Sequence, residues 1–117
     1  MTRLRTGELN RRVTLQRRDP TQDTFGEVNP VWVDVQTVWS AIQPLSGREL
    51  ELAQKVASEV THRLTIRYQP SLTDTRVVAG MRALYKNRVF NILASMNEDE
   101  ANVLIHLMAT EGTNEGG

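Results

Sequence analysis

The pattern of apolar and polar positions predicts six β-strands along the chain. They are residues 11–18, 30–42, 59–69, 82–85, 88–96 and 102–109. Most of them alternate apolar and polar side chains, as strands with one buried face do. The second has 13 residues, well above the usual five or six, so we expect it to be bent or bulged. The sixth is apolar on both faces, which predicts that both faces are covered.

A helix is predicted between the second and third strands, from Gly47 to about Ala57. Ser46 and Glu49 have the spacing of a capping box, and Leu45 and Leu50 have that of a hydrophobic staple. At 100° per residue the apolar side chains cover about 160° of the helix surface, more than packing on one sheet face requires. Two interpretations remain open. The helix packs only on its own core, or it also packs on another subunit.

The segments between the predicted elements are rich in turn-forming residues. Residues 19–29 form a long loop with Phe25 as its one large apolar side chain. Residues 70–75 are expected to form a turn and residues 76–81 a short connector. A hairpin turn is predicted at Lys86-Asn87, because asparagine tolerates the positive φ that such turns need.

With 117 residues the chain is long enough for one domain with its own core. We expect this domain at residues 10–109, between a flexible arm at 1–9 and a disordered tail at 110–117. The predicted fold class is α+β, mainly β. It is a small antiparallel β-barrel or sandwich of about six strands, with one α-helix inserted after the second. No apolar run reaches 18 residues, so a soluble protein without a secretion signal is expected.

The net charge of zero conceals a strong asymmetry along the chain. Residues 1–18 hold six arginines and one glutamate, a net charge of +5. Residues 97–117 hold five acidic residues and no basic one, a net charge of −5. This distribution suits head-to-tail association of copies as well as it suits an anionic partner.

The side chains that catalysis usually needs are scarce. The chain has no cysteine and two histidines, His62 and His106, which we expect to be hydrogen-bonded structural residues. The acidic turn at residues 97–101 is better explained as a solvated turn than as a cation site. We therefore predict no enzyme activity, no catalytic residue, no cofactor and no metal.

A single-stranded nucleic-acid-binding module is the alternative function, since small barrels bind single strands through aromatic side chains in a basic groove. Phe25 and Trp32 are the candidates for exposed aromatic platforms. Trp39, Tyr68 and Phe90 are assigned to the core. The absence of net positive charge weakens this alternative.

Nine short motifs along the chain resemble one family. In order, they are Gly7-Glu8-Leu9, Arg12-Val13-Thr14-Leu15-Gln16, Phe25-Gly26-Glu27, Trp32, Val38-Trp39-Ser40-Ala41-Ile42, Pro44-Leu45-Ser46-Gly47-Arg48-Glu49, Thr61-His62-Arg63, Ile66-Arg67-Tyr68 and Arg88-Val89-Phe90-Asn91-Ile92. This series, spanning about residues 7–108, resembles the head-tail joining (head closure or stopper) proteins of tailed bacteriophages and related gene transfer particles. The chain departs from the family pattern in a longer connector at 76–81 and in Asn87 and Asn91.

The resemblance implies a structural protein of the virion, made in the cytoplasm of a bacterial host. It implies a homo-oligomeric ring in the head-tail connector, below the portal and the adaptor (head completion) protein and above a tail terminator or tail completion protein. DNA would pass through the ring without sequence-specific binding, and no membrane is involved. The segment after the second strand would help to close or line this channel.

Two sets of residues are the resulting site hypotheses. The channel or partner contacts are Leu45, Ser46, Arg48, Glu49, Glu51, Leu52, Lys55, Val56 and Phe25. The ring-interface charges are Arg11, Arg12, Arg17, Arg18, Glu98, Asp99 and Glu100.

Overall fold

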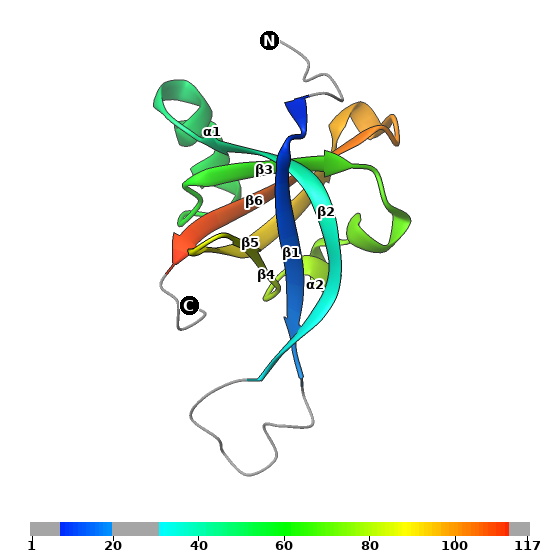
Figure 1. Cartoon of the computed structure of the whole chain (residues 1–117). Helices are drawn as coiled ribbons and strands as arrows, with labels where there is room; N and C mark the ends of the chain where they lie inside the picture. The colour runs from blue at the N-terminus through cyan, green and yellow to red at the C-terminus, as the bar shows by residue number, and fades with distance from the viewer. Residues whose placement is uncertain (1–7, 20–30, 113–117) are drawn as a thin grey trace.

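The computed structural model describes residues 8–19 and 31–112, and in this part of the chain six antiparallel strands close into a barrel in the order β1-β2-β3-β6-β5-β4 (Figure 1). The strands are β1 (Arg11–Arg18), β2 (Trp32–Pro44), β3 (His62–Arg67), β4 (Arg82–Tyr85), β5 (Arg88–Asn97) and β6 (Leu104–Gly112). Helix α1 (Gly47–Val56) joins β2 to β3, and the short helix α2 (Thr75–Val78) lies between β3 and β4. The predicted fold class is confirmed, and the barrel form is the one adopted.

Strand β2 is the bent strand that its length predicted (Figure 1). Its first part pairs with β1 and its second with β3, and Ser40 belongs to both pairings. The register with β1 shifts where Leu15 pairs with Gln36 and Gln16 with Asp34, which leaves Val35 as the extra residue of a bulge. The bulge and the change of partner let one strand serve two sides of a small barrel.

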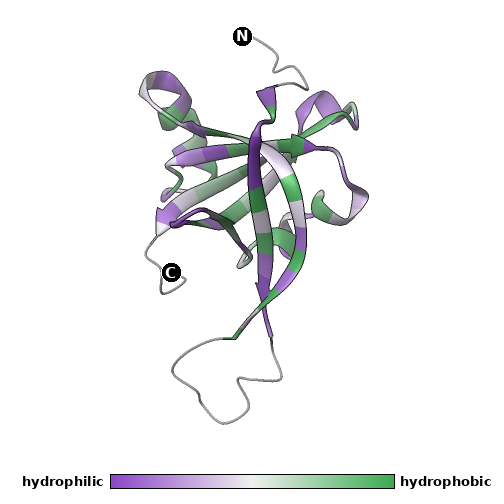
Figure 2. Cartoon of the chain, in the orientation of Figure 1, coloured by the Kyte–Doolittle hydropathy of each residue, from purple (hydrophilic) through white to green (hydrophobic). Residues whose placement is uncertain are grey.

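The main core fills the inside of the barrel with side chains from all six strands. Figure 2 shows hydrophobic and hydrophilic residues alternating along several of them. Val13 and Leu15 of β1, which the sequence assigned to one buried face, are both fully buried, as is Phe90 of β5. Each strand of the closed barrel pairs with a neighbour on both sides over at least part of its length, which limits the exposed strand edges.

Strand β6 is covered on both faces, as predicted. Its inward side chains belong to the main core, whereas Met108 on the outward face packs in a second cluster with Ala53 of α1. Near the start of the strand, Leu104 packs with Leu9 and Ala41 in a third cluster. Leu9 is 5% exposed, although the sequence placed it in a flexible arm.

The core assignment of Trp39 was wrong. Trp39 is 50% exposed on the outer face of β2, and the inward positions are Val38 and the fully buried Ser40. Small barrels often mix small and large residues inside, so the larger apolar side chain of a strand is not always the inward one.

Several element boundaries also differ from the expected ones. Strand β3 is shorter than residues 59–69, and β6 continues to Gly112 instead of ending at Ala109. The connector at 76–81 begins with α2, whose cap Asp74 accepts a hydrogen bond from the Arg76 amide. In the β4–β5 hairpin the positive φ belongs to Lys86, at 54°, and not to Asn87.

Candidate interaction site

An apolar groove lies beside α1, along the second core cluster. It has a volume of about 220 Å³. It is lined by Leu45, Glu49, Leu52, Ala53, Val56, Arg63, Met96 and Met108. Leu52, Val56 and Met96 are 50%, 62% and 46% exposed, so the apolar rim of the groove faces solvent. Half-exposed apolar side chains that gather around one hollow are typical of a contact surface.

The polar end of the groove is held by Arg63 of β3. Its guanidinium donates two hydrogen bonds to the Gln43 side-chain oxygen, at 3.2 and 3.0 Å, and one to Glu49 at 3.1 Å. The Arg63 side chain is 19% exposed and that of Glu49 54% exposed. An ion pair this exposed adds little stability, but it fixes the arginine at the groove wall.

The predicted capping box at the start of α1 does not form. Ser46 occupies the N-cap position, but its hydroxyl makes no capping hydrogen bond, and Glu49 binds Arg63 instead of the Ser46 amide. Gly47 follows with a φ of +55°, a left-handed conformation that favours glycine. The left-handed turn at Gly47 thus gives the helix its entry angle and so sets the position of the groove.

The structure brings together four of the nine predicted contact residues, since Leu45, Glu49, Leu52 and Val56 line the groove. The other four described contacts are exposed and do not line it: Ser46, Arg48, Glu51 and Lys55. Phe25 lies outside the described residues. Sequence reasoning missed the opposite wall, formed by Arg63, Met96 and Met108. Methionines on the outward face of a strand next to an over-apolar helix are a signal that could have indicated it.

The structure places the predicted ring-interface charges at three separate positions. Arg11 and Arg12 point to opposite faces of β1, where they lie over the rings of Tyr85 and Trp39 at 5.9 and 5.0 Å from the centroids. Arg17 and Arg18 lie at the other end of β1. The acidic residues Glu98, Asp99 and Glu100 form a short 3-10 turn before β6.

His106 lies in the middle of a partly buried series of hydrogen bonds. Its Nδ1 is 2.8 Å from the Thr65 hydroxyl, and its Nε2 is 2.9 Å from a Glu98 carboxylate oxygen. This order of threonine, histidine and carboxylate occurs in nucleophilic sites, but Thr65 is completely buried, so its hydroxyl is not accessible to a substrate. These hydrogen bonds join the acidic turn to the barrel wall, as expected of a hydrogen-bonded structural histidine.

His62 closes one end of the barrel. Its Nδ1 lies 2.9 Å from the Thr61 hydroxyl, and its ring meets Phe90 edge to face at 5.2 Å. Burial is the main cause that lowers the pKa of His62, and Glu111, 3.7 Å away, opposes the shift. Glu111 also forms two hydrogen bonds with Arg88, which lower the pKa of the carboxyl.

Two classes of site find no support within residues 8–19 and 31–112. No group of three or more potential metal ligands occurs there. In the same ranges, no helix has the length and apolar character needed to cross a membrane.

Comparison with known protein families identifies the family of this chain. The phage head completion protein family matches residues 4–112, nearly the whole chain. The chain belongs to this family. The resemblance seen in the sequence motifs is therefore confirmed, and membership of this family indicates a structural role in the virion.

Two solved structures share the fold of the chain. A protein from Shigella flexneri 2a, determined in solution, superposes with a TM-score of 0.66 at 25% identity, over 95% of this chain and 99% of the other. A chain of the virion of a native gene transfer agent particle superposes with a TM-score of 0.58 at 20% identity, over 89% and 96% of the two chains, and shows the same fold. A sequence search of curated proteins finds no match.

Proposed function

We propose that this protein forms a homo-oligomeric ring in the head-tail connector, with the groove beside α1 as the main contact between neighbouring copies. The observation that carries the proposal is the exposed apolar rim of Leu52, Val56 and Met96 around a hollow on a member of a virion-assembly family. The groove supports the second interpretation of the helix, in which its wide apolar arc serves its own core and a neighbour as well.

The chemistry of the groove suits a permanent contact between proteins. Complete burial of a leucine, valine or methionine side chain contributes about 1.5–3 kcal/mol, and three half-exposed ones stand together here. Arg63 already satisfies Glu49 and Gln43, so covering it leaves no new unpaired charge. A closed ring needs two unlike patches that fit each other, and the groove supplies the concave one.

In the proposed arrangement the ring lies between the adaptor protein on the head side and the tail terminator or tail completion protein below. DNA passes through its centre. The polar residues of α1, Arg48, Glu51 and Lys55, lie outside the groove and are exposed. They are free to face the channel while the apolar side of the helix meets the neighbouring copy. The role is positional, and no catalytic step is assigned to it.

A matched pair of substitutions on α1 tests this function. Leu52→Gln places a polar group in the groove, whereas Glu51→Gln changes the adjacent exposed position that does not line it. Ring formation on the upstream head complex would be followed by electron microscopy and by sedimentation. We expect Leu52→Gln to abolish assembly and Glu51→Gln to preserve it, with both monomers folded. Normal assembly of the Leu52→Gln protein would refute the groove contact.

A further inference from the structure

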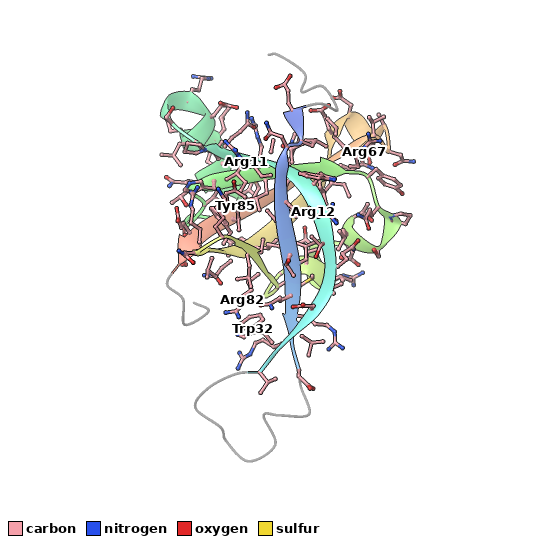
Figure 3. The ribbon with its side chains drawn as sticks, viewed as in Figure 1. Arg11, Arg12, Trp32, Arg67, Arg82 and Tyr85 are labelled. Carbon is pink, nitrogen blue, oxygen red and sulfur yellow. The ribbon has the colours of Figure 1, made fainter. Side chains whose placement is uncertain are left out.

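A row of two arginines and one tryptophan crosses the outer face of three neighbouring strands. Arg12 of β1 pairs in register with Trp39 of β2. The pairing of Ser40 with Ile66 places Trp39 next to Arg67 of β3 on its other side. Figure 3 shows Arg12 and Arg67 on this part of the barrel. Because neighbouring strands are about 4.8 Å apart, the two arginine backbones are separated by about 10 Å.

No carboxylate within the described part of the chain neutralises the two arginines of this row. Arg63, Arg76 and Arg88 each form an ion pair with a carboxylate. Arg12 and Arg67 form none with any residue of the ranges 8–19 and 31–112. The Arg12 guanidinium instead lies over the Trp39 ring, 5.0 Å from its centroid.

A shallow hollow opens on the Arg67 side of the tryptophan. It has a volume of about 300 Å³ and is lined by Leu9, Asn10, Trp39 and Arg67. Arg12 is not among the lining residues, and the indole of Trp39 is half exposed. The row therefore offers a half-exposed indole at a hollow, with one arginine on each of the two flanking strands.

We infer that this row binds single-stranded nucleic acid, with one base stacked on Trp39 in the hollow and the flanking phosphates on Arg12 and Arg67. An indole surface provides stacking for an unpaired base of any sequence, and arginines provide contacts to the phosphates. A duplex keeps the faces of its bases stacked on one another and cannot use the tryptophan in this way. An acidic peptide would need only the two arginines, so the exposed indole favours the nucleic acid.

The site lies outside the groove beside α1 and does not depend on ring formation. The sequence analysis predicted other aromatic residues, Phe25 and Trp32, as the exposed platforms. Trp32 is instead partly buried, and the guanidinium of Arg82 lies 4.2 Å from its ring centroid. Two phosphate contacts give modest affinity that decreases as the salt concentration rises.

Fluorescence anisotropy of a labelled oligothymidylate with the full-length protein, at 50 mM salt, tests the assignment. Trp39→Ala should raise the Kd by roughly 5- to 150-fold, the usual loss for one stacked base, and Trp39→Phe should recover most of the affinity. The double variant Arg12→Gln, Arg67→Gln should reduce the slope of log K against log salt by about 1.4. Arg76→Gln removes an exposed arginine outside the row that already pairs with Asp74, and it should change neither quantity.

Four results would overturn the inference. They are no binding by the wild-type protein, no effect of Trp39→Ala in a protein that melts normally, equal competition by duplex DNA of the same length, and equal competition by polyglutamate. The last would point to an acidic protein segment as the ligand. Leu52→Gln should bind the oligonucleotide normally, so failure of ring assembly and failure of this site are distinguishable.

Discussion

The inside of the barrel and the groove beside α1 are built from the same kinds of side chain, yet they differ in closure. Inside, Leu64, Ile66 and Phe90 are completely buried, each held between strands that pair on both sides. In the groove, Leu52 and Val56 remain at least half exposed. The interior completes its packing within one chain, whereas the groove can gain its full apolar stabilisation only when another molecule covers it. Stability and assembly are therefore assigned to different residues.

Removing a side chain from the closed region should have the largest effect. Phe90→Ala leaves a cavity in the main core and should lower the free energy of unfolding by about 3–5 kcal/mol. Urea denaturation followed by circular dichroism measures the change. Met96→Ala, at the rim of the groove, is the control and should cost below about 1 kcal/mol. Equal losses for the two variants would remove the distinction between the regions.

The entry turn of α1, which positions the groove, should respond at glycine and not at serine. Gly47→Ala places a side chain at a φ of +55° and should cost about 1–2 kcal/mol through backbone strain. An added Cβ meets no atom within 4 Å, so a steric clash adds nothing to this cost. Ser46→Ala removes no capping hydrogen bond and should change stability by below about 0.5 kcal/mol. Thermal unfolding of both variants provides the comparison. A loss of about 1 kcal/mol for Ser46→Ala would restore the capping box.

The folded protein should also lose stability in mild acid, because of the histidine at one end of the barrel, His62. Burial lowers the pKa of His62 in the folded protein below its unfolded value of about 6.5, so folding favours the neutral imidazole. This contribution is complete above the unfolded pKa and is lost as the pH falls from there through the folded pKa. Melting temperatures between pH 7.5 and 5 should therefore decrease, and they should decrease less in His62→Gln.

The Glu111 carboxyl affects stability in a more acidic pH range than His62 does. Its hydrogen bonds with Arg88 lower the pKa of the carboxyl, so its contribution is present above about pH 4.5 and disappears only in stronger acid. Glu111→Gln should therefore remove the loss below that pH and, because Glu111 opposes the lowering of the His62 pKa, should increase the loss between pH 7.5 and 5. A His62→Gln protein with the same loss between pH 7.5 and 5 as the wild type would show that another group controls this range.

The smallest effect on the isolated chain is expected from the open region. Leu52→Ala should change the free energy of unfolding of the monomer by below about 0.5 kcal/mol, as for an ordinary surface position. The same variant should weaken assembly, because it removes the methyl groups that the proposed contact between copies would bury. Sedimentation of the monomer and of the assembled complex measures the two effects on one sample. A large loss of monomer stability would instead place Leu52 in the closed core.

The sequence predicted the elements of this fold because their patterns are local. Alternation identified the strands, and the excess length of the second strand predicted its bend. The apolar pattern of the sixth strand predicted cover on both faces, which α1 and Leu9 provide. The interaction site was predicted only in part. Its α1 wall lies in one continuous segment, whereas Met96 and Met108 reach it only when β5 and β6 close the barrel.

Two errors have the same origin in contacts between distant parts of the chain. Glu49 has the spacing of a capping residue, but Arg63, fourteen positions away, offers an opposite charge and takes it. Trp39 is large and apolar, as core residues often are, but Val38 and Ser40 are the residues of this part of β2 that point into the barrel. Neither competition is visible in the local pattern, and both altered the candidate sites more than they altered the fold.

Cryo-electron microscopy of the neck of purified particles tests the central claim most directly, at a resolution that shows the side chains of α1. We predict a closed ring of copies in which the groove bounded by Leu52, Val56 and Met96 is filled by the neighbouring copy. A ring in which this groove remains open to solvent, or is filled by a different protein, would contradict the assignment of the groove to subunit contact.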